Sequence, residues 1–185
     1  MKKTQYNVTF GGIGGQGIIT ASELLGWAAL YDRYSVKKSE VHGMSQRGGS
    51  VESHVRFGKG VFSPLLGAGQ ADFLLCFHED EHARLALFLK DDGVDLFEWL
   101  DKAQAMIDNP KMLNTALMGV LAAYLPIQQP SWDRAFETVF PEKIRRHNQD
   151  IFNKARQAAQ TAMNPKKRGR DFKNEEMIYD LERND

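Results

Sequence analysis

The chain has 185 residues, 42% of them hydrophobic, which is enough for one core and short for two complete domains. Its 24 basic and 24 acidic side chains give a formal net charge of zero, so the overall field that attracts nucleic acid is absent. No apolar run reaches the ~20 residues of a membrane span, and no apolar signal segment opens the chain. We therefore expect a cytoplasmic protein without membrane or nucleic-acid partners.

The most informative segment is a glycine-dense turn near the N-terminus. Alternating apolar and polar residues over 6–10 predict a short strand, and apolar residues at helical spacing over 18–29 predict a helix. Between them, Gly12, Gly14 and Gly17 fit the dinucleotide-binding pattern GxGxxG. The free N–H groups at the start of such a helix are suited to hold an anion such as a pyrophosphate.

The same pattern has other interpretations. Taken alone, it also suits a tight turn that binds no ligand. A nicotinamide-dinucleotide fold places an acid about 20 residues further on, at the end of a second strand, to hold the ribose hydroxyls. Here Lys37 and Lys38 precede the only acid of that region, Glu40. NAD is therefore disfavoured as the ligand, whereas a more phosphorylated or a non-nicotinamide anion stays possible. Because no lysine follows Gly17, the turn does not fit the P-loop pattern.

Two further strands are predicted. Residues 51–57 alternate, which indicates a half-covered strand with His54 on its polar face. We interpret His54 as a surface residue, because no second histidine or acid repeats at metal-ligand spacing. The continuous apolar run over 72–77 predicts a central strand covered on both sides, whose end is a candidate edge of a site. Cys76 inside this run is expected to be buried, and a single cysteine cannot hold an iron–sulfur cluster, which takes about four thiolates.

Helical periodicity dominates the rest of the chain. It predicts helices over 82–90 and 113–124 and two more on either side of Pro141, whereas 94–100 suits either a strand or a helix. Strands early and helices late indicate an α/β fold: a Rossmann-like, open, mostly parallel sheet flanked by helices, with a helical C-terminal part.

The last segment differs in composition from the rest. From Asn164 onwards it is rich in charge and has too few apolar residues for a core. We expect one domain at 1–163 and a charged, flexible tail at 164–185, with a partner-docking arm as the alternative.

A second motif spans 39–50. It places Glu40, His42, Gln46 and Arg47 beside three glycines directly before a strand. Glycines let the backbone approach a ligand, and the guanidinium of Arg47 offers a planar fork for phosphate or carboxylate. Because no nucleophile lies beside His42, we interpret this loop as a binding element and not as a catalytic one.

Together the two motifs resemble the gamma-type subunit of 2-oxoacid:ferredoxin oxidoreductases, which pairs a GGxGGQG loop with a downstream acid and an RGG turn. Residues 39–56 look most like the beta subunit of indolepyruvate:ferredoxin oxidoreductase. Further similarity runs through Glu81, Arg84 and Asn114, so the resemblance covers roughly residues 7–162. One departure follows Gly93, where the family has another buried strand and a longer connection, and this leaves the extent of the sheet open.

The resemblance implies an accessory subunit and not a whole enzyme. Oxidative decarboxylation of a 2-oxoacid uses thiamine diphosphate, iron–sulfur clusters and coenzyme A. By resemblance, a larger partner subunit carries the thiamine diphosphate and the clusters and passes electrons to ferredoxin, while this domain packs against it and either helps to hold coenzyme A or shapes the entrance to the active site. The implied substrate is an aryl pyruvate such as indolepyruvate, in anaerobic metabolism. The isolated chain is expected to be inactive, and whether it forms a homodimer in isolation is left open by the sequence.

The implied site contains no catalytic and no metal-binding residue of this chain. The residues expected to contact a cofactor are Gly12, Gly14, Gly15, Gln16, Gly17 and Thr20 in the first loop and Ser45, Gln46, Arg47, Gly48 and Gly49 in the second. Two alternatives stay open: an independent Rossmann-like oxidoreductase that binds NAD(P) or a flavin, and a purely structural subunit whose loops close a protein interface.

Overall fold

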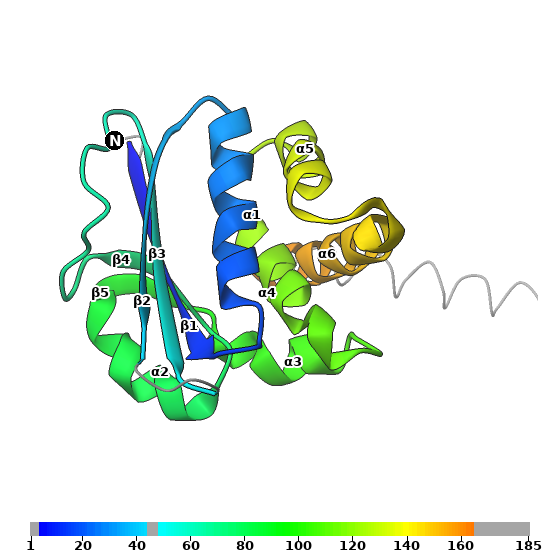
Figure 1. Ribbon diagram of the computed structural model, residues 1–185, viewed down its shortest axis with the longest axis horizontal. Coiled ribbons are helices and arrows are strands. Elements are labelled where there is room, and N and C mark those ends of the chain that lie inside the picture. The colour runs from blue at the N-terminus through cyan, green and yellow to red at the C-terminus, as the bar shows by residue number, and fades with distance from the viewer. Residues whose placement is uncertain (1–3, 44–47, 165–185) are drawn as a thin grey trace, which may run out of the picture.

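The computed structural model describes residues 4–43 and 48–164 (Figure 1). They contain a five-stranded sheet of order β2-β3-β1-β4-β5. The strands are β1 (Gln5–Ile13), β2 (Ser35–His42), β3 (Ser50–Gly58), β4 (Ala71–Cys76) and β5 (Leu89–Asp95). β1 is parallel to β4, and β4 to β5, whereas β3 is antiparallel to both of its neighbours. Four strands therefore share one direction, which confirms the open, mostly parallel sheet expected from the sequence.

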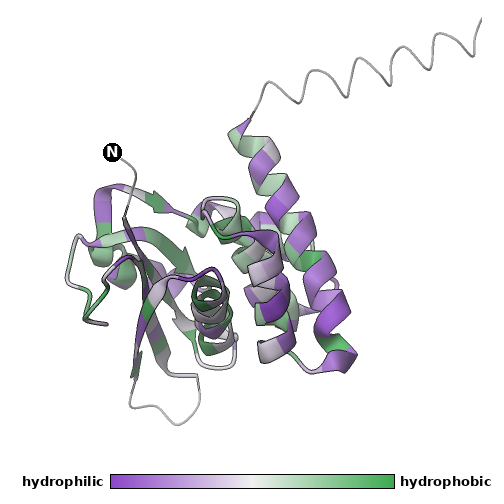
Figure 2. Cartoon of the chain, turned by 90° about the horizontal axis from the view of Figure 1, so that it is seen from above, coloured by the Kyte–Doolittle hydropathy of each residue, from purple (hydrophilic) through white to green (hydrophobic). Residues whose placement is uncertain are grey.

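Helices cover the two faces of the sheet unequally. The helices are α1 (Ile18–Tyr31), α2 (Glu79–Leu85), α3 (Leu100–Gln104), α4 (Leu113–Ala122), α5 (Gln129–Val139) and α6 (Glu142–Met163). In both views, α1 lies between the sheet and the C-terminal helices (Figures 1 and 2). α2 packs on the opposite face, where its Leu85 meets Gly11 at the centre of the sheet. The sheet is therefore flanked by helices, with a helical C-terminal part on the α1 side.

The main core lies between the sheet and α1, and α4 is buried within it. Every residue of α4 is buried, because α1, α3 and α6 surround it. A close crossing with α6 makes this possible: a Cβ added at Gly119 would lie 2.2 Å from the carbonyl oxygen of Phe152. Full enclosure thus explains why α4 is apolar apart from Asn114 and Thr115.

A smaller apolar cluster lies beneath α2. It contains Leu74, Cys76 and Leu85, with Phe88 and Phe97 packed against it. Cys76 is 1% exposed and burial raises the pKa of its thiol, which confirms the expected packing role. β4 is accordingly buried on both faces, as its continuous apolar sequence predicts.

The region after α2 corrects a sequence-based expectation. The helix predicted over 82–90 ends at Leu85, a 3-10 turn η1 (Ala86–Phe88) follows, and β5 begins at Leu89. β5 pairs in parallel with β4, which satisfies backbone groups that β4 would otherwise leave unpaired. The shortened middle of the chain therefore still supplies an edge strand. Residues 94–100, for which the sequence allowed either a strand or a helix, contain the end of β5 and a 3-10 turn η2 (Phe97–Trp99).

The helices around Pro141 agree with the sequence. α5 and α6 lie on either side of it, and Pro141 is the N-cap of α6. The division into a domain at 1–163 and a tail at 164–185 stays a prediction, since residues after 164 lie outside the described part. Within the described part, no helix is long and apolar enough to cross a membrane.

Candidate functional site

The first glycine turn joins the end of β1 to the start of α1. Two of its residues have positive φ, 101° at Gly15 and 80° at Gly17, a conformation that disfavours any side chain with a Cβ. Gly17 is the N-cap of α1 and offers no side-chain cap. The glycines therefore set the shape of the turn and leave the N-terminus of α1 without a competing side chain.

Gln16 ties this turn to the sheet. Its Oε1 accepts a hydrogen bond from the backbone N–H of Ile13 at 2.8 Å, and its Nε2 donates to the carbonyl oxygen of Phe77 at 3.0 Å. Gly12 lies in β1 beneath this bridge, where a Cβ would approach Gln16 Oε1 to 2.6 Å and Phe77 Cβ to 2.9 Å. Gln16 thus fixes the turn against the end of β4, the strand end that the sequence marks as a candidate site edge.

The second glycine motif meets the first. The N–H of Gly14 donates to the carbonyl oxygen of Gly49 at 2.8 Å, and a Cβ at Gly48 would lie 3.9 Å from the side chain of Ile13. Ser45, Gln46 and Arg47 lie outside the described residues. The two glycine motifs, 34 residues apart between Gly14 and Gly48 in the sequence, are therefore brought together at one end of the sheet.

Part of the second motif differs from the expected loop. Its first residues continue β2 as far as His42, in regular pairing that runs from Ser39 opposite His54 to His42 opposite Val51. Long-range pairing with β3 explains the difference, because the local sequence, rich in polar residues, carries no clear strand signal. Only the segment after His42 is left to form the loop.

Asn114 contacts the turn from α4, although the sequence alone predicted no role for it. It lies in the first turn of α4, is 6% exposed, and its Nδ2 donates to the carbonyl oxygen of Gly17 at 3.4 Å. Its Oδ1 accepts from the backbone N–H of Thr115 at 2.8 Å. The only sequence signal for Asn114 was its place in the family resemblance.

The resulting surface is suited to anion binding. Gly14 and Gly15 are exposed, and nothing lies within 4 Å of the position a Cβ would take at Gly15. The first N–H groups of α1 have no partner within the helix, and the positive end of the helix dipole favours negative charge. Thr20 is half-buried in the first turn. The geometry can therefore hold a phosphate group through backbone donors.

A polar network, buried at His54 and Glu52 and exposed at Arg84, extends from this end of the sheet across the face opposite α1. His54 Nδ1 lies 3.0 Å from Thr9 Oγ1, and His54 Nε2 lies 2.8 Å from Glu52 Oε1. Arg84 continues the network from α2: its Nη1 donates to Glu52 Oε2 at 2.5 Å and its Nη2 to Ser50 Oγ at 2.8 Å. The network therefore connects the strand beside the second glycine motif to α2.

His54 is buried, so the prediction from alternation that it lies on the surface is wrong. It is 5% exposed, and its ring lies 4.8 Å from that of Phe88 in an edge-on contact. β3 is covered on both faces here because α2 and η1 pack on its polar face. Polar residues alternate along β3 because they form this network, not because they face water.

The network also assigns the proton on His54. Glu52 is paired with Arg84 and only accepts, so Nε2 of His54 carries the hydrogen and Nδ1 accepts from the Thr9 hydroxyl. Burial lowers the pKa of His54, with a further contribution from the Arg84 charge, against the opposing effect of Glu52. Burial would raise the pKa of Glu81, but hydrogen bonds from Ser50 and Arg84 hold it below its ordinary value. The network therefore favours a neutral imidazole on His54 and an ionised Glu81.

This arrangement predicts that the free energy of unfolding falls as pH drops below about 6.5, the ordinary histidine pKa. The unfolded chain then gains a proton on His54 that the folded chain resists, so acid favours unfolding until pH passes the lowered folded pKa. Urea unfolding between neutral and mildly acidic pH measures this slope. In His54→Gln, which keeps a donor toward Glu52, the slope should be smaller; an equal slope would assign the pH dependence to other groups.

The donor chemistry of the described residues does not fit an iron–sulfur cluster or a metal ion. Cys76 is the only cysteine in the sequence and is buried. Within the described part of the chain, no group of three or more histidine, cysteine, aspartate or glutamate side chains is placed to hold a metal. The backbone donors at α1, in contrast, fit the diphosphate of a nucleotide-like cofactor.

Comparison with known proteins places these motifs in one family. The model of the pyruvate ferredoxin/flavodoxin oxidoreductase family matches residues 7–98. Indolepyruvate oxidoreductase subunit IorB of Thermococcus kodakarensis is 50% identical over 90 residues, which is 49% of this chain and 45% of that relative. The chain therefore matches somewhat less than half the length of this curated relative.

Solved structures with the same fold agree. The gamma subunit of a keto/oxoacid ferredoxin oxidoreductase from Geobacter sulfurreducens has a TM-score of 0.70 at 21% identity, covering 86% of this chain and 99% of that one. A 2-oxoglutarate:ferredoxin oxidoreductase from Magnetococcus marinus has a TM-score of 0.72 at 14% identity, covering 86% and 32%. The expected gamma-type fold is thereby confirmed. Residues 7–98, which contain both glycine motifs, therefore match a domain of the pyruvate ferredoxin/flavodoxin oxidoreductase family.

Proposed function

We propose that this chain is the accessory, gamma-type subunit of a 2-oxoacid:ferredoxin oxidoreductase. The complex would decarboxylate a 2-oxoacid, transfer the acyl group to coenzyme A and pass the electrons to ferredoxin. The 50% identity to an indolepyruvate oxidoreductase subunit supports an aryl pyruvate such as indolepyruvate as the substrate. A cytoplasmic location, within anaerobic metabolism, is part of the same proposal.

One observation carries the proposal: the matched domain has a glycine turn whose geometry suits an anion, but its only cysteine is Cys76, too few thiolates for an iron–sulfur cluster. One buried cysteine cannot supply the thiolates of a cluster, so electron transfer requires a partner. We place thiamine diphosphate and the iron–sulfur clusters in a larger subunit against which this domain packs.

Coenzyme A is the ligand that we propose for the glycine turn. Its diphosphate would lie against the backbone N–H groups at the start of α1, beside exposed Gly14 and Gly15 and the hydroxyl of Thr20. Gly12, Gln16 and Gly17 would set the shape of the turn. When bound, coenzyme A supplies the thiol that accepts the acyl group. The solved relative from Magnetococcus marinus, which holds coenzyme A, supports this choice of ligand.

In the second loop, Gly48 and Gly49 would support the turn through the contact of Gly49 with Gly14. Ser45, Gln46 and Arg47 are proposed to face the ligand or the larger subunit, and Arg47 is suited to a phosphate oxygen.

The topology argues against an independent NAD(P)-binding oxidoreductase. In that fold, the strand after the first helix lies directly beside the first strand and ends in an acid that holds the ribose. Here β3 separates β2 from β1, so the end of β2 lies about 10 Å from β1, two strand spacings instead of one. Glu40 near that end is paired with Lys38.

Isolation of the complex tests the proposal. The tagged full chain, purified without oxygen from its native host, is expected to bring with it a larger subunit that contains thiamine diphosphate and iron–sulfur clusters. Addition of indolepyruvate and coenzyme A should reduce ferredoxin, whereas the chain purified alone should not. Oxidation of a 2-oxoacid by the chain alone, or tight binding of NADP or a flavin in a titration, would contradict the accessory role.

A further inference from the structure

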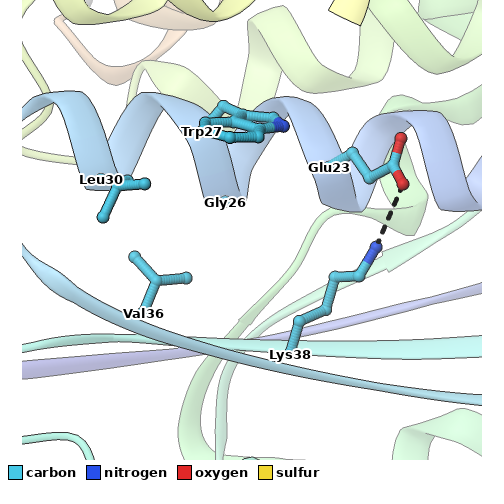
Figure 3. A pocket seen from close by; sticks show the side chains of 6 residues that line it. All are labelled: Glu23, Gly26, Trp27, Leu30, Val36 and Lys38. Atoms are coloured by element: carbon cyan, nitrogen blue, oxygen red, sulfur yellow. Dashed lines mark ion pairs between the residues drawn. The ribbon is translucent and has the colours of Figure 1, made fainter.

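The outer edge of β2 lies beside an exposed apolar groove. Among the described residues, β2 pairs only with β3, so its other edge is free for backbone hydrogen bonds. Between this strand and α1 is a groove of about 330 Å³ (Figure 3). The residues that line it are Glu23, Gly26, Trp27, Leu30, Val36 and Lys38.

The apolar side chains of the groove are held in an exposed position. Trp27 is 40% exposed and Leu30 is 50% exposed, both on α1. The ring of Trp27 stacks on Tyr31 at 5.7 Å, and Tyr31 is itself fixed by Arg134, whose guanidinium lies 4.1 Å from its ring. An exposed tryptophan that stacks on a neighbouring ring beside a free strand edge is typical of a protein interface.

The two edges of the sheet differ in a way that favours association at β2. β5 carries Asp91 and Asp92, both exposed, and its pairing with β4 is irregular, which are common protections against edge pairing. β2 is regular over its whole length and carries both signs of charge, with Lys38 and Glu40 on the side of α1. A partner strand with the opposite charge order would therefore match it.

β2 supplies that opposite order itself when a second copy runs antiparallel to it. A two-fold axis normal to the sheet pairs residues of the same face, and an axis at Ser39 places Lys38 opposite Glu40 of the second copy and Glu40 opposite its Lys38. Neighbouring registers, with the axis at Lys38 or at Glu40, would place two lysines or two glutamates opposite each other. Charge complementarity thus selects one register.

The same axis brings the two grooves together. Strands in a sheet lie about 4.8 Å apart, and α1 covers β2 and β3, so the two α1 helices would lie side by side across the junction. Packed helices are typically 8–10 Å apart. Trp27 and Leu30 of each copy would then be covered by the α1 helix of the other.

We propose that a second copy of this chain docks on this surface, with the two β2 strands antiparallel about Ser39 and the exposed α1 side chains packed over the junction. The proposal does not depend on the ligand of the glycine turn. In this dimer the two five-stranded sheets would form one continuous sheet, with a β5 strand at each end.

Charge exchange tests the register directly. All variants of the full chain carry Glu23→Gln, which removes the other acid facing Lys38. In sedimentation equilibrium, this parent should be a reversible dimer. Lys38→Glu and Glu40→Lys should each raise the dissociation constant about tenfold, because each exchanges two attractive contacts for two repulsive ones. The double variant should return to the parent value.

Two further variants serve as controls. Asp92→Lys makes the same charge change as Glu40→Lys on the opposite sheet edge and should leave the dimer unchanged. Leu30→Ser, an exposed position, should weaken it without loss of folded structure by circular dichroism.

The outcomes separate this proposal from the proposed function. A chain that is monomeric at all concentrations, or a double variant that fails to regain association, would overturn the dimer. The dimer would also be overturned if Glu40→Lys left self-association intact but the larger subunit no longer co-purified with the variant. The surface would then belong to that partner. The accessory function is judged independently, by the cofactors and activity of the purified complex.

Discussion

Replacing Gly119 with alanine is expected to lower the free energy of unfolding by about 2–3 kcal/mol, the cost of overpacking a tight core. The new Cβ would lie 2.2 Å from the carbonyl oxygen of Phe152 and 3.0 Å from the Cβ of Ala155, both on α6. Since a backbone carbonyl cannot turn away as a side chain can, α4 and α6 must separate. This separation would open contacts along α4, whose residues are all buried.

The matched control is Gly26→Ala in α1. There the nearest atom to an added Cβ is Val36 Cγ1 at 3.9 Å, an ordinary contact. Alanine favours helix over glycine by about 1 kcal/mol, so this variant should be slightly more stable than the parent. Urea unfolding of both variants measures the difference. Equal effects would mean that the close crossing of α4 and α6 does not limit side-chain size at Gly119.

The spacing of apolar residues and the turn residues predicted the elements whose formation depends mainly on their own sequence. The strand, glycine turn and helix at the N-terminus, the buried β4 and the helices around Pro141 were all recognisable from periodicity and turn residues. β5 was not, because a short edge strand with an Asp91-Asp92-Gly93 run shows no alternation and is defined by its pairing with β4. Such pairing joins residues far apart in sequence.

The same limit applies to the site. The glycine motifs were recognisable, but the hydrogen bond from Gly14 to Gly49 and the donation from Asn114 to Gly17 depend on how elements meet. His54 shows the error most clearly: alternation distinguishes polar from apolar faces, but it cannot tell water from a buried network. Arg84, 30 residues later than His54 in the sequence, supplies that network from α2.

The junction of Gly17 with Asn114 links stability to the proposed coenzyme site. An alanine at Gly17 would adopt φ of 80°, and its Cβ would lie 2.5 Å from Asn114 Nδ2. Gly15 also has positive φ, but nothing lies within 4 Å of the corresponding Cβ. The two positions therefore share backbone strain and differ in contact with a buried amide.

Gly17→Ala is accordingly expected to cost about 2–4 kcal/mol in urea unfolding, and Gly15→Ala about 1–2 kcal/mol, the strain of the left-handed conformation alone. Asn114→Ala should reduce the additional cost of Gly17→Ala, because it removes the group that the new Cβ meets. In the complex, Gly17→Ala should raise the KM for coenzyme A more than that for the 2-oxoacid, since it displaces the N-terminus of α1. An unchanged KM for coenzyme A in a folded Gly17→Ala complex would place the diphosphate elsewhere.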